Sequence, residues 1–172
     1  MGESDIPGWD VPEGTRSPRI YFYDDNPDNP SPTGPGPDDR GMHLFAGGPD
    51  NPESAMQQRI QLDSGWLEAI RAGRVKFKFS AYLGGKDAEA DQAAAALTFL
   101  DEQGNPVGQV TLPSIGPQER QDKTGLFPVA LSDYIPQGAY SVLVTVTFQG
   151  NDGGFNDGYA DNLSLTLMEV GQ

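Results

Sequence analysis

Alternation of apolar and polar residues is the clearest pattern in this chain. It is cleanest over residues 140–148, where valines and aromatics alternate with Ser, Leu and Thr, and it recurs over 56–62, 75–83 and 163–167. Successive side chains of a strand point to opposite faces, so this alternation is typical of strands with one buried face. The pattern therefore predicts a body of β-strands in which one side of each strand faces a core.

One stretch departs from the alternation and predicts a short helix over residues 65–72. Asp63 or Ser64 supplies a side-chain oxygen at its start, and Gly73 follows its last turn. Ser and Asp are favoured N-caps because they accept from free backbone N–H groups, and glycine is favoured just beyond a helix C-terminus.

Residues 93–100 fit two interpretations. Their four alanines favour a helix, whereas residues 97–100 followed by the polar turn 101–105 favour a strand that forms a hairpin with 107–112. Intrinsic propensity is a weak guide when it conflicts with a hairpin pattern. We interpret the segment as a strand.

The segment 1–54 differs from the rest because prolines punctuate it and aliphatic residues are few. It is predicted to be a Pro/Asp-rich arm with one convincing strand over 19–23, packed on the body or on a neighbour. From Gly41 the alternation resumes and predicts a strand over 42–48. The body is predicted to span 55–172, in one structural domain overall. We expect an all-β fold, a jelly-roll β-sandwich of about eight antiparallel strands with one short helix and this N-terminal arm.

Composition narrows the classes of function. The formal net charge of -14 argues against nucleic acid and anionic membranes as partners, since both attract Lys and Arg. There is no cysteine, and no apolar run is long enough to span a membrane. Met1 is followed by Gly-Glu-Ser-Asp, which has neither a basic start nor an apolar stretch, so no signal peptide is expected.

The residues for common catalytic machinery are largely missing. His43 is the one histidine, and no Gly-x-Ser-x-Gly elbow accompanies it. A glycosidase-like carboxylate pair cannot be identified among 25 acidic residues by spacing alone. We therefore expect a protein that is not an enzyme.

A Gly/Asn/Asp-rich stretch over residues 150–162 separates the last two predicted strands. We expect it to form a loop at one end of the sandwich that offers ligand contacts through Asn156, Asp157 and Tyr159. Trp9 either packs on the edge of the sandwich or stacks on a ligand. The loop does not match the EF-hand pattern, although oxygen ligands on rigid glycine turns suit Ca²⁺; the alternative is that Asn and Asp simply form turns.

Several motifs together resemble a known family. They are the runs 39–48 (DRGMHLFAGG), 81–85 (AYLGG), 97–101 (LTFLD) and 156–165 (NDGYADNLSL). In this order they are similar to the galactose-binding-like jelly-roll domain of bacterial PEP-CTERM-type surface proteins, which is related to carbohydrate-binding modules. The resemblance covers roughly residues 9–167, without the opening strand, the export signal and the C-terminal anchor usual in the family.

The resemblance implies a structural Ca²⁺ where the first and last strands meet. Asp161 would be its side-chain ligand, with Asp39 or a carbonyl near Gly41 opposite. It also implies a non-catalytic binding or adhesion module for a glycan or surface polymer. The alternative is a structural accessory subunit of a larger assembly, such as a phage capsid decoration protein, contacting neighbouring subunits. An extracellular or virion surface is the favoured location in either case.

Overall fold

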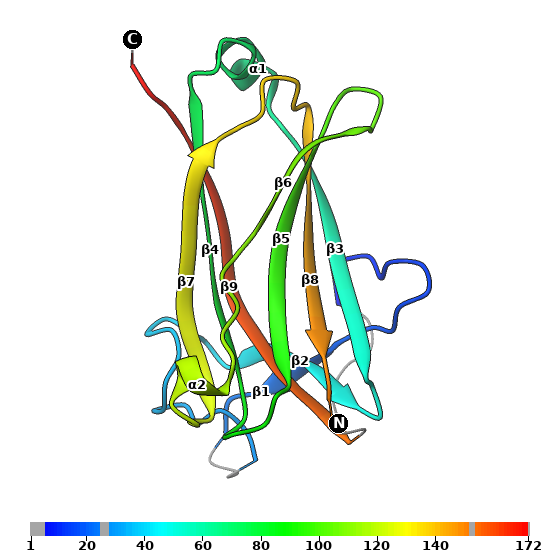
Figure 1. The fold of residues 1–172 in the computed structure, drawn as a ribbon, viewed down its shortest axis with the longest axis vertical. Helices are drawn as coiled ribbons and strands as arrows, with labels where there is room; N and C mark the ends of the chain where they lie inside the picture. The colour runs from blue at the N-terminus through cyan, green and yellow to red at the C-terminus, as the bar shows by residue number, and fades with distance from the viewer. Residues whose placement is uncertain (1–5, 25–27, 152–153, 172) are drawn as a thin grey trace.

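In the part of the chain that the structure describes, nine strands form two antiparallel sheets that face each other (Figure 1). One sheet has five strands in the order β1-β2-β9-β4-β7, and the other has four in the order β3-β8-β5-β6. The elements are β1 (Arg19–Phe22), β2 (His43–Pro49), β3 (Glu53–Gln61), α1 (Ser64–Arg71), β4 (Val75–Gly85), β5 (Gln92–Leu100), β6 (Pro106–Thr111), α2 (Pro117–Arg120), β7 (Gly125–Tyr134), β8 (Ser141–Gln149) and β9 (Phe155–Glu169). The predicted all-β sandwich is confirmed.

This computed structural model describes residues 6–24, 28–151 and 154–171. The opening residues 1–5, on which the signal-peptide expectation rests, lie outside it, as do 25–27 of the arm, 152–153 of the Gly/Asn/Asp-rich stretch, and 172. Within the described residues no helix has the length and apolar character needed to cross a membrane.

The core lies between the sheets and is built from the alternating positions. Phe77 and Phe99 come from opposite sheets, and their ring centroids are 5.2 Å apart. The largest fully buried apolar side chains of this core are Phe77, Phe79, Phe99, Phe148, Met56, Ile70, Leu83 and Leu97. Burial of one face of every central strand explains why the sequence alternates.

The predicted helix and the ambiguous segment both match the expectations. Asp63 caps α1 by accepting a hydrogen bond from the Gly65 amide at 2.8 Å, and Gly73 follows the helix with φ of 69°. Residues 92–100 form β5, paired with β8 and β6. Backbone pairing on both sides and burial of alternate residues outweigh the helical preference of alanine.

The prediction of a loop over 150–162 is wrong from residue 155 onwards. β9 pairs with β2 and β4, and its fifteen residues include the positions expected to be apical. Gly158 is required for close packing, because a Cβ there would lie 2.5 Å from the carbonyl oxygen of Gln92. Asn162 adopts φ of 48° and makes a bulge, where the register with β4 shifts.

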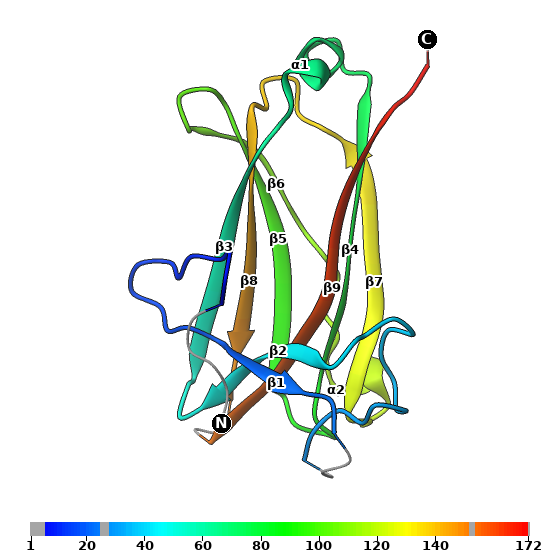
Figure 2. The same cartoon turned by 180° about the vertical axis from the view of Figure 1, so that it is seen from behind.

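The two strands predicted in the N-terminal segment, at 19–23 and 42–48, are confirmed as β1 and β2, and β2 lies inside the five-stranded sheet. Residues 28–40, which we call the strap, pack on the outward face of that sheet, near the lower ends of β7 and α2 (Figure 2). The amide of Leu126 donates to the carbonyl of Pro35 at 3.0 Å. Arg40 holds the strap together by donating to the carbonyls of Ser31, Gly34 and Pro37.

We expect Gly158→Ala to destabilise the protein by about 2 kcal/mol or more, because the methyl group would force β9 away from the first residues of β5. Urea unfolding measures this. Gly138→Ala is the matched control, since its added Cβ would meet only a Val107 methyl at 3.6 Å. Equal effects of the two substitutions would contradict the packing role of Gly158.

Candidate functional site

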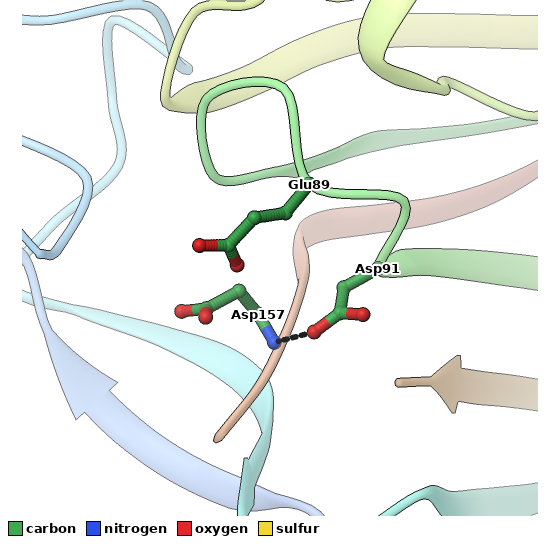
Figure 3. A group of neighbouring side chains, drawn as sticks. All are labelled: Glu89, Asp91 and Asp157. Atoms are coloured by element: carbon green, nitrogen blue, oxygen red, sulfur yellow. Dashed lines mark hydrogen bonds between the residues drawn. The ribbon is translucent and has the colours of Figure 1, made fainter. Parts of the chain in front are cut away.

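Three carboxylates gather at the lower end of the sandwich (Figure 3). Glu89 and Asp91 come from the connection between β4 and β5, and Asp157 comes from β9. One oxygen of each lies within 4.8 Å of the others, and Asp91 and Asp157 are buried. We call these residues the acidic cluster.

Backbone amides fix the position of Asp91. Its Oδ1 accepts from the amide of Asn151 at 2.7 Å and its Oδ2 accepts from the amide of Asp157 at 2.9 Å. The segment that follows β8 and the start of β9 are therefore both hydrogen-bonded to the buried carboxylate of Asp91.

Asp157 lies in a setting that disfavours its charge. Burial, together with the neighbouring carboxyl of Glu89, raises the pKa of Asp157 to about 7, although the Tyr159 hydroxyl donates to its Oδ1 at 2.6 Å. Burial also raises the pKa of Tyr159, so the phenol stays a hydrogen-bond donor. A cation placed among the cluster would favour the ionised form of Asp157.

A buried arginine shapes the connection that bears Glu89. The Arg120 side chain is fully buried, and its Nη2 donates to the carbonyls of Lys86, Asp87 and Glu89 at 2.8–3.0 Å. One guanidinium thus gathers three carbonyls on one side of the connection. These bonds fix the backbone of the connection from which the Glu89 side chain projects.

A pocket of about 440 Å³ opens beside the acidic cluster and is lined by Tyr21, Asp28, Asn29, Lys86, Phe155 and Asp157. The rings of Tyr21 and Phe155 meet edge to face with centroids 5.2 Å apart, and both are half-buried. Lys86 Nζ lies 3.0 Å from Asp28 Oδ1 and 3.7 Å from Glu89 Oε1. The pocket combines apolar ring surface with charged and amide groups, which is typical of a site for a polar small molecule.

The predicted calcium ligands lie elsewhere on the same outward face. Asp161 accepts from the Tyr23 hydroxyl at 2.7 Å and from the Asn162 amide at 2.7 Å. The Asn162 side chain donates to Asp39 at 2.7 Å, so it links the two predicted ligands. Gly41 is exposed with φ of 63°. Burial raises the pKa of Asp161, and the carboxylate of Asp39 acts in the same direction.

Of the four residues predicted to touch a ligand, Asp157 lines the pocket. Asn156 is 1% exposed and donates to the Asn51 carbonyl at 2.9 Å, while Tyr159 is 1% exposed beneath the strap. Trp9 is half-buried and packs edge to face on Phe45, with ring centroids 6.3 Å apart.

A second cavity of about 470 Å³ contains the histidine, and its lining is Pro7, Ile20, Phe22, His43, Leu44, Phe45 and Asp161. Phe22 is 57% exposed and lies 4.5 Å from the His43 ring, centroid to centroid. None of these described lining residues carries a hydroxyl or thiol, so His43 and Asp161 face no serine or threonine nucleophile here.

Sequence reasoning missed Tyr21, Lys86, Glu89, Asp91 and Phe155. A usable signal was present in Glu89 and Asp91, whose spacing of two residues at a strand entry places both side chains on one side. Their meeting with Asp157 depends on β9 passing beside β4, which local patterns do not specify.

The raised pKa of Asp157 gives a pH prediction for protein kept in chelator. Between pH 4 and pH 7 the folded state binds a proton that the unfolded state has lost, so stability falls as pH rises through this window and then levels off. We expect Asp157→Asn to remove about 2–4 kcal/mol of this fall, measured by urea unfolding across pH. Asp38→Asn, at an exposed strap position, is the control; an unchanged slope in Asp157→Asn would refute the assignment.

Comparison with known proteins supports the fold. No protein-family model matches the chain, and no curated protein matches its sequence. Among solved structures, the enzymatically active domain of tailspike protein 4 from bacteriophage CBA120 is similar with a TM-score of 0.59 and 18% identity over 96% of this chain, which spans only 20% of the tailspike chain.

Two other similar structures match nearly end to end. A cyclase from Fischerella sp. TAU, in complex with 4-(1H-indol-3-yl)butan-2-one, has a TM-score of 0.56 and 11% identity over 99% of this chain and 90% of its own. The CBM22-1 xylan-binding domain of Xyn10C from Paenibacillus barcinonensis has a TM-score of 0.52 and 10% identity over 98% and 91%. At these identities the likeness shows the shared β-sandwich fold, which carbohydrate-binding modules also adopt.

Proposed function

We propose that this protein is a non-catalytic glycan-binding module that holds a sugar in the pocket lined by Tyr21 and Phe155. The supporting observation is the chemistry of that pocket. Two half-buried rings offer faces or edges to sugar C–H groups, and Asp157, Lys86 and Asn29 offer donors and acceptors for hydroxyls. A xylan-binding domain with the same fold supports the same class of ligand.

The proposal of a binding module in place of an enzyme rests on the sites described. Asp157 and Glu89 are close together beside Lys86, and the cavity around His43 lacks a hydroxyl nucleophile among its described lining residues. The acids are engaged with one another, with Tyr159 and with backbone amides. This arrangement favours binding and structural roles.

We further propose that Ca²⁺ stabilises the acidic cluster. Hard oxygen donors are the ligands that Ca²⁺ prefers, and Glu89, Asp91 and Asp157 supply three carboxylates whose oxygens already lie within 4.8 Å of one another. The ion would offset the burial and the repulsion from Glu89 that together raise the pKa of Asp157. The site inferred from the family resemblance, formed by Asp161, Asp39 and Gly41, is the competing location.

An accessory-subunit role in a larger assembly is the alternative function. It requires a partner chain on the arm, whereas the described part of the arm packs on its own body through the strap and through backbone bonds between Asp10 and Gln57. Self-association that persists without glycan would favour that alternative.

The pocket is tested by titrating the protein with xylo- and galacto-oligosaccharides in a calorimeter. We expect saturable binding that Phe155→Ala weakens about tenfold or more, because a ring contact is lost. Phe22→Ala is the control, since Phe22 lines the other cavity and is 57% exposed. No binding across a glycan panel, or equal loss in both variants, would reject the pocket as the site.

Calcium is tested by thermal unfolding at neutral pH with and without chelator. At a hundredfold excess over Kd we expect Ca²⁺ to raise Tm by about 5–10 °C. Glu89→Gln should abolish the shift and Asp39→Asn should leave it intact. The reverse pattern would place the ion at Asp161, and a Tm indifferent to Ca²⁺ would reject both locations.

A further inference from the structure

The outward face of β9, β4 and β7 beyond the strap has an unusual charge pattern. Pairing places Lys76 beside Tyr134, Lys78 beside Ser132, and Tyr82 beside Pro128. In a chain with 25 acidic and 11 basic residues, no Asp or Glu occupies an outward position of β4 or β7 on this face. We call this surface the open face; its strands β9, β4 and β7 run lengthwise, side by side, in Figure 1.

Its two lysines have no carboxylate partner among the described residues. Lys76 Nζ lies 4.8 Å from the centroid of the Tyr134 ring, a cation–π contact that positions the ammonium without neutralising it. Lys78 is exposed. By contrast, Lys86 has two carboxylate partners.

The acidic groups around the open face are engaged or directed elsewhere. Glu169 lies 3.2 Å from Arg74 in an ion pair, and Asp161 is buried and bonded to Tyr23. Asp133 is opposite Phe77 and therefore belongs to the other face of β7. Asp39 is exposed and accepts from Asn162, so one carboxylate does lie near that end of the open face. The ammonium groups of Lys76 and Lys78 are not neutralised by an ion pair among the described residues. Exposed acidic groups farther from the two lysines than the Debye length, about 8 Å at physiological salt, are largely screened from them.

The open face is also hollowed. A depression of about 270 Å³ lies between β4 and β7, and its lining includes Lys78, Ser80, Tyr82, Pro128, Ala130 and Asn162. The depression brings together the half-buried Tyr82 ring, the Ser80 hydroxyl, the Asn162 amide and the Lys78 ammonium group. Along β4 the distance from Lys76 to Tyr82 is about 20 Å, since each residue of a strand adds about 3.3 Å.

We propose that the open face binds a linear anionic polysaccharide, whose sugar carboxylates or sulfates contact Lys76 and Lys78 while a sugar ring enters the depression at Tyr82. Charge-assisted bonds to unneutralised ammonium groups select the anion, and hydroxyl and amide groups match sugar hydroxyls. The Ser80 hydroxyl and the Asn162 amide at the depression suit sugar hydroxyls, which favours a polysaccharide over nucleic acid. The net charge of -14 acts against both kinds of polyanion alike, so the two lysines must supply the local attraction. This site is separate from the Tyr21–Phe155 pocket and does not depend on it.

Affinity electrophoresis and calorimetry with paired polymers test the proposal. Polygalacturonate is compared with its methyl ester, and dextran sulfate with dextran, at low and at physiological salt. We expect tighter binding of at least one anionic polymer than of its neutral partner, with affinity falling as salt rises. The pair that responds distinguishes carboxylate from sulfate recognition.

The double variant Lys76→Gln/Lys78→Gln should weaken anionic binding about tenfold or more and flatten its salt dependence. Tyr82→Ala should weaken it as well. Lys123→Gln, at an exposed loop position, is the control for loss of a surface lysine outside the open face and should have no effect. Because Lys76 and Lys78 are surface residues, an unchanged Tm verifies that the double variant is folded.

Three results would overturn the proposal: equal binding of charged and neutral polymers, unchanged affinity in the double variant, or equally tight binding of a single-stranded DNA oligonucleotide. Suppose that Phe155→Ala abolishes oligosaccharide binding, whereas the double variant binds every polymer as tightly as the unmodified protein does. The pocket function then stands and the proposal for the open face fails. If no glycan of any kind binds, both proposals fail.

Discussion

Two carboxylates, those of Asp157 and Asp161, lie buried on the outward face of β9. The structure of the lower half of the molecule depends on the hydrogen bonds that compensate for their burial. Asp157 accepts from the Tyr159 hydroxyl at 2.6 Å and Asp161 accepts from the Tyr23 hydroxyl at 2.7 Å. Burial disfavours the charge of both acids and raises their pKa. The strap that buries them is therefore coupled to their protonation and to any cation nearby.

Arginine side chains provide much of the order in the irregular segments. Arg40 collects carbonyls of the strap, and Arg120 collects carbonyls of the connection between β4 and β5. Buried backbone carbonyls need partners, and a guanidinium can serve several at once. Proline-rich and Gly/Asp-rich segments of the kind usually expected to be disordered are thereby held against the sheet.

The outward faces of the two sheets carry different kinds of side chain. The difference favours the five-stranded sheet as the ligand-binding side. The strand residues that face outward on the four-stranded sheet are mainly Gln, Thr and Ala, among them Gln57, Thr145 and Ala96, and the described positions there include no aromatic ring. The five-stranded sheet presents Tyr21, Tyr82 and Phe155 towards its lower end and Tyr134 at the last residue of β7. Aromatic surface beside polar groups suits sugar recognition, so both proposed sites lie on the five-stranded side.

The sequence allowed the strands, the helix cap at Asp63 and the choice of strand for residues 92–100 to be predicted, because these follow from periodicity and local capping. The same reasoning placed Asp157 and Tyr159 in a loop, since glycine and asparagine suggest turns when pairing partners are unknown. In the structure Gly158 permits close approach of Gln92, and Asn162 makes a bulge. The acidic cluster joins residues 89 and 157, a long-range contact that no local pattern encodes.

The central claim is that glycans bind on the side of the five-stranded sheet. A crystal structure of the protein with a bound oligosaccharide tests it most directly. The account predicts sugar density in the pocket lined by Tyr21 and Phe155 or in the depression at Tyr82. Density confined to the Gln- and Thr-rich face of the four-stranded sheet would contradict it.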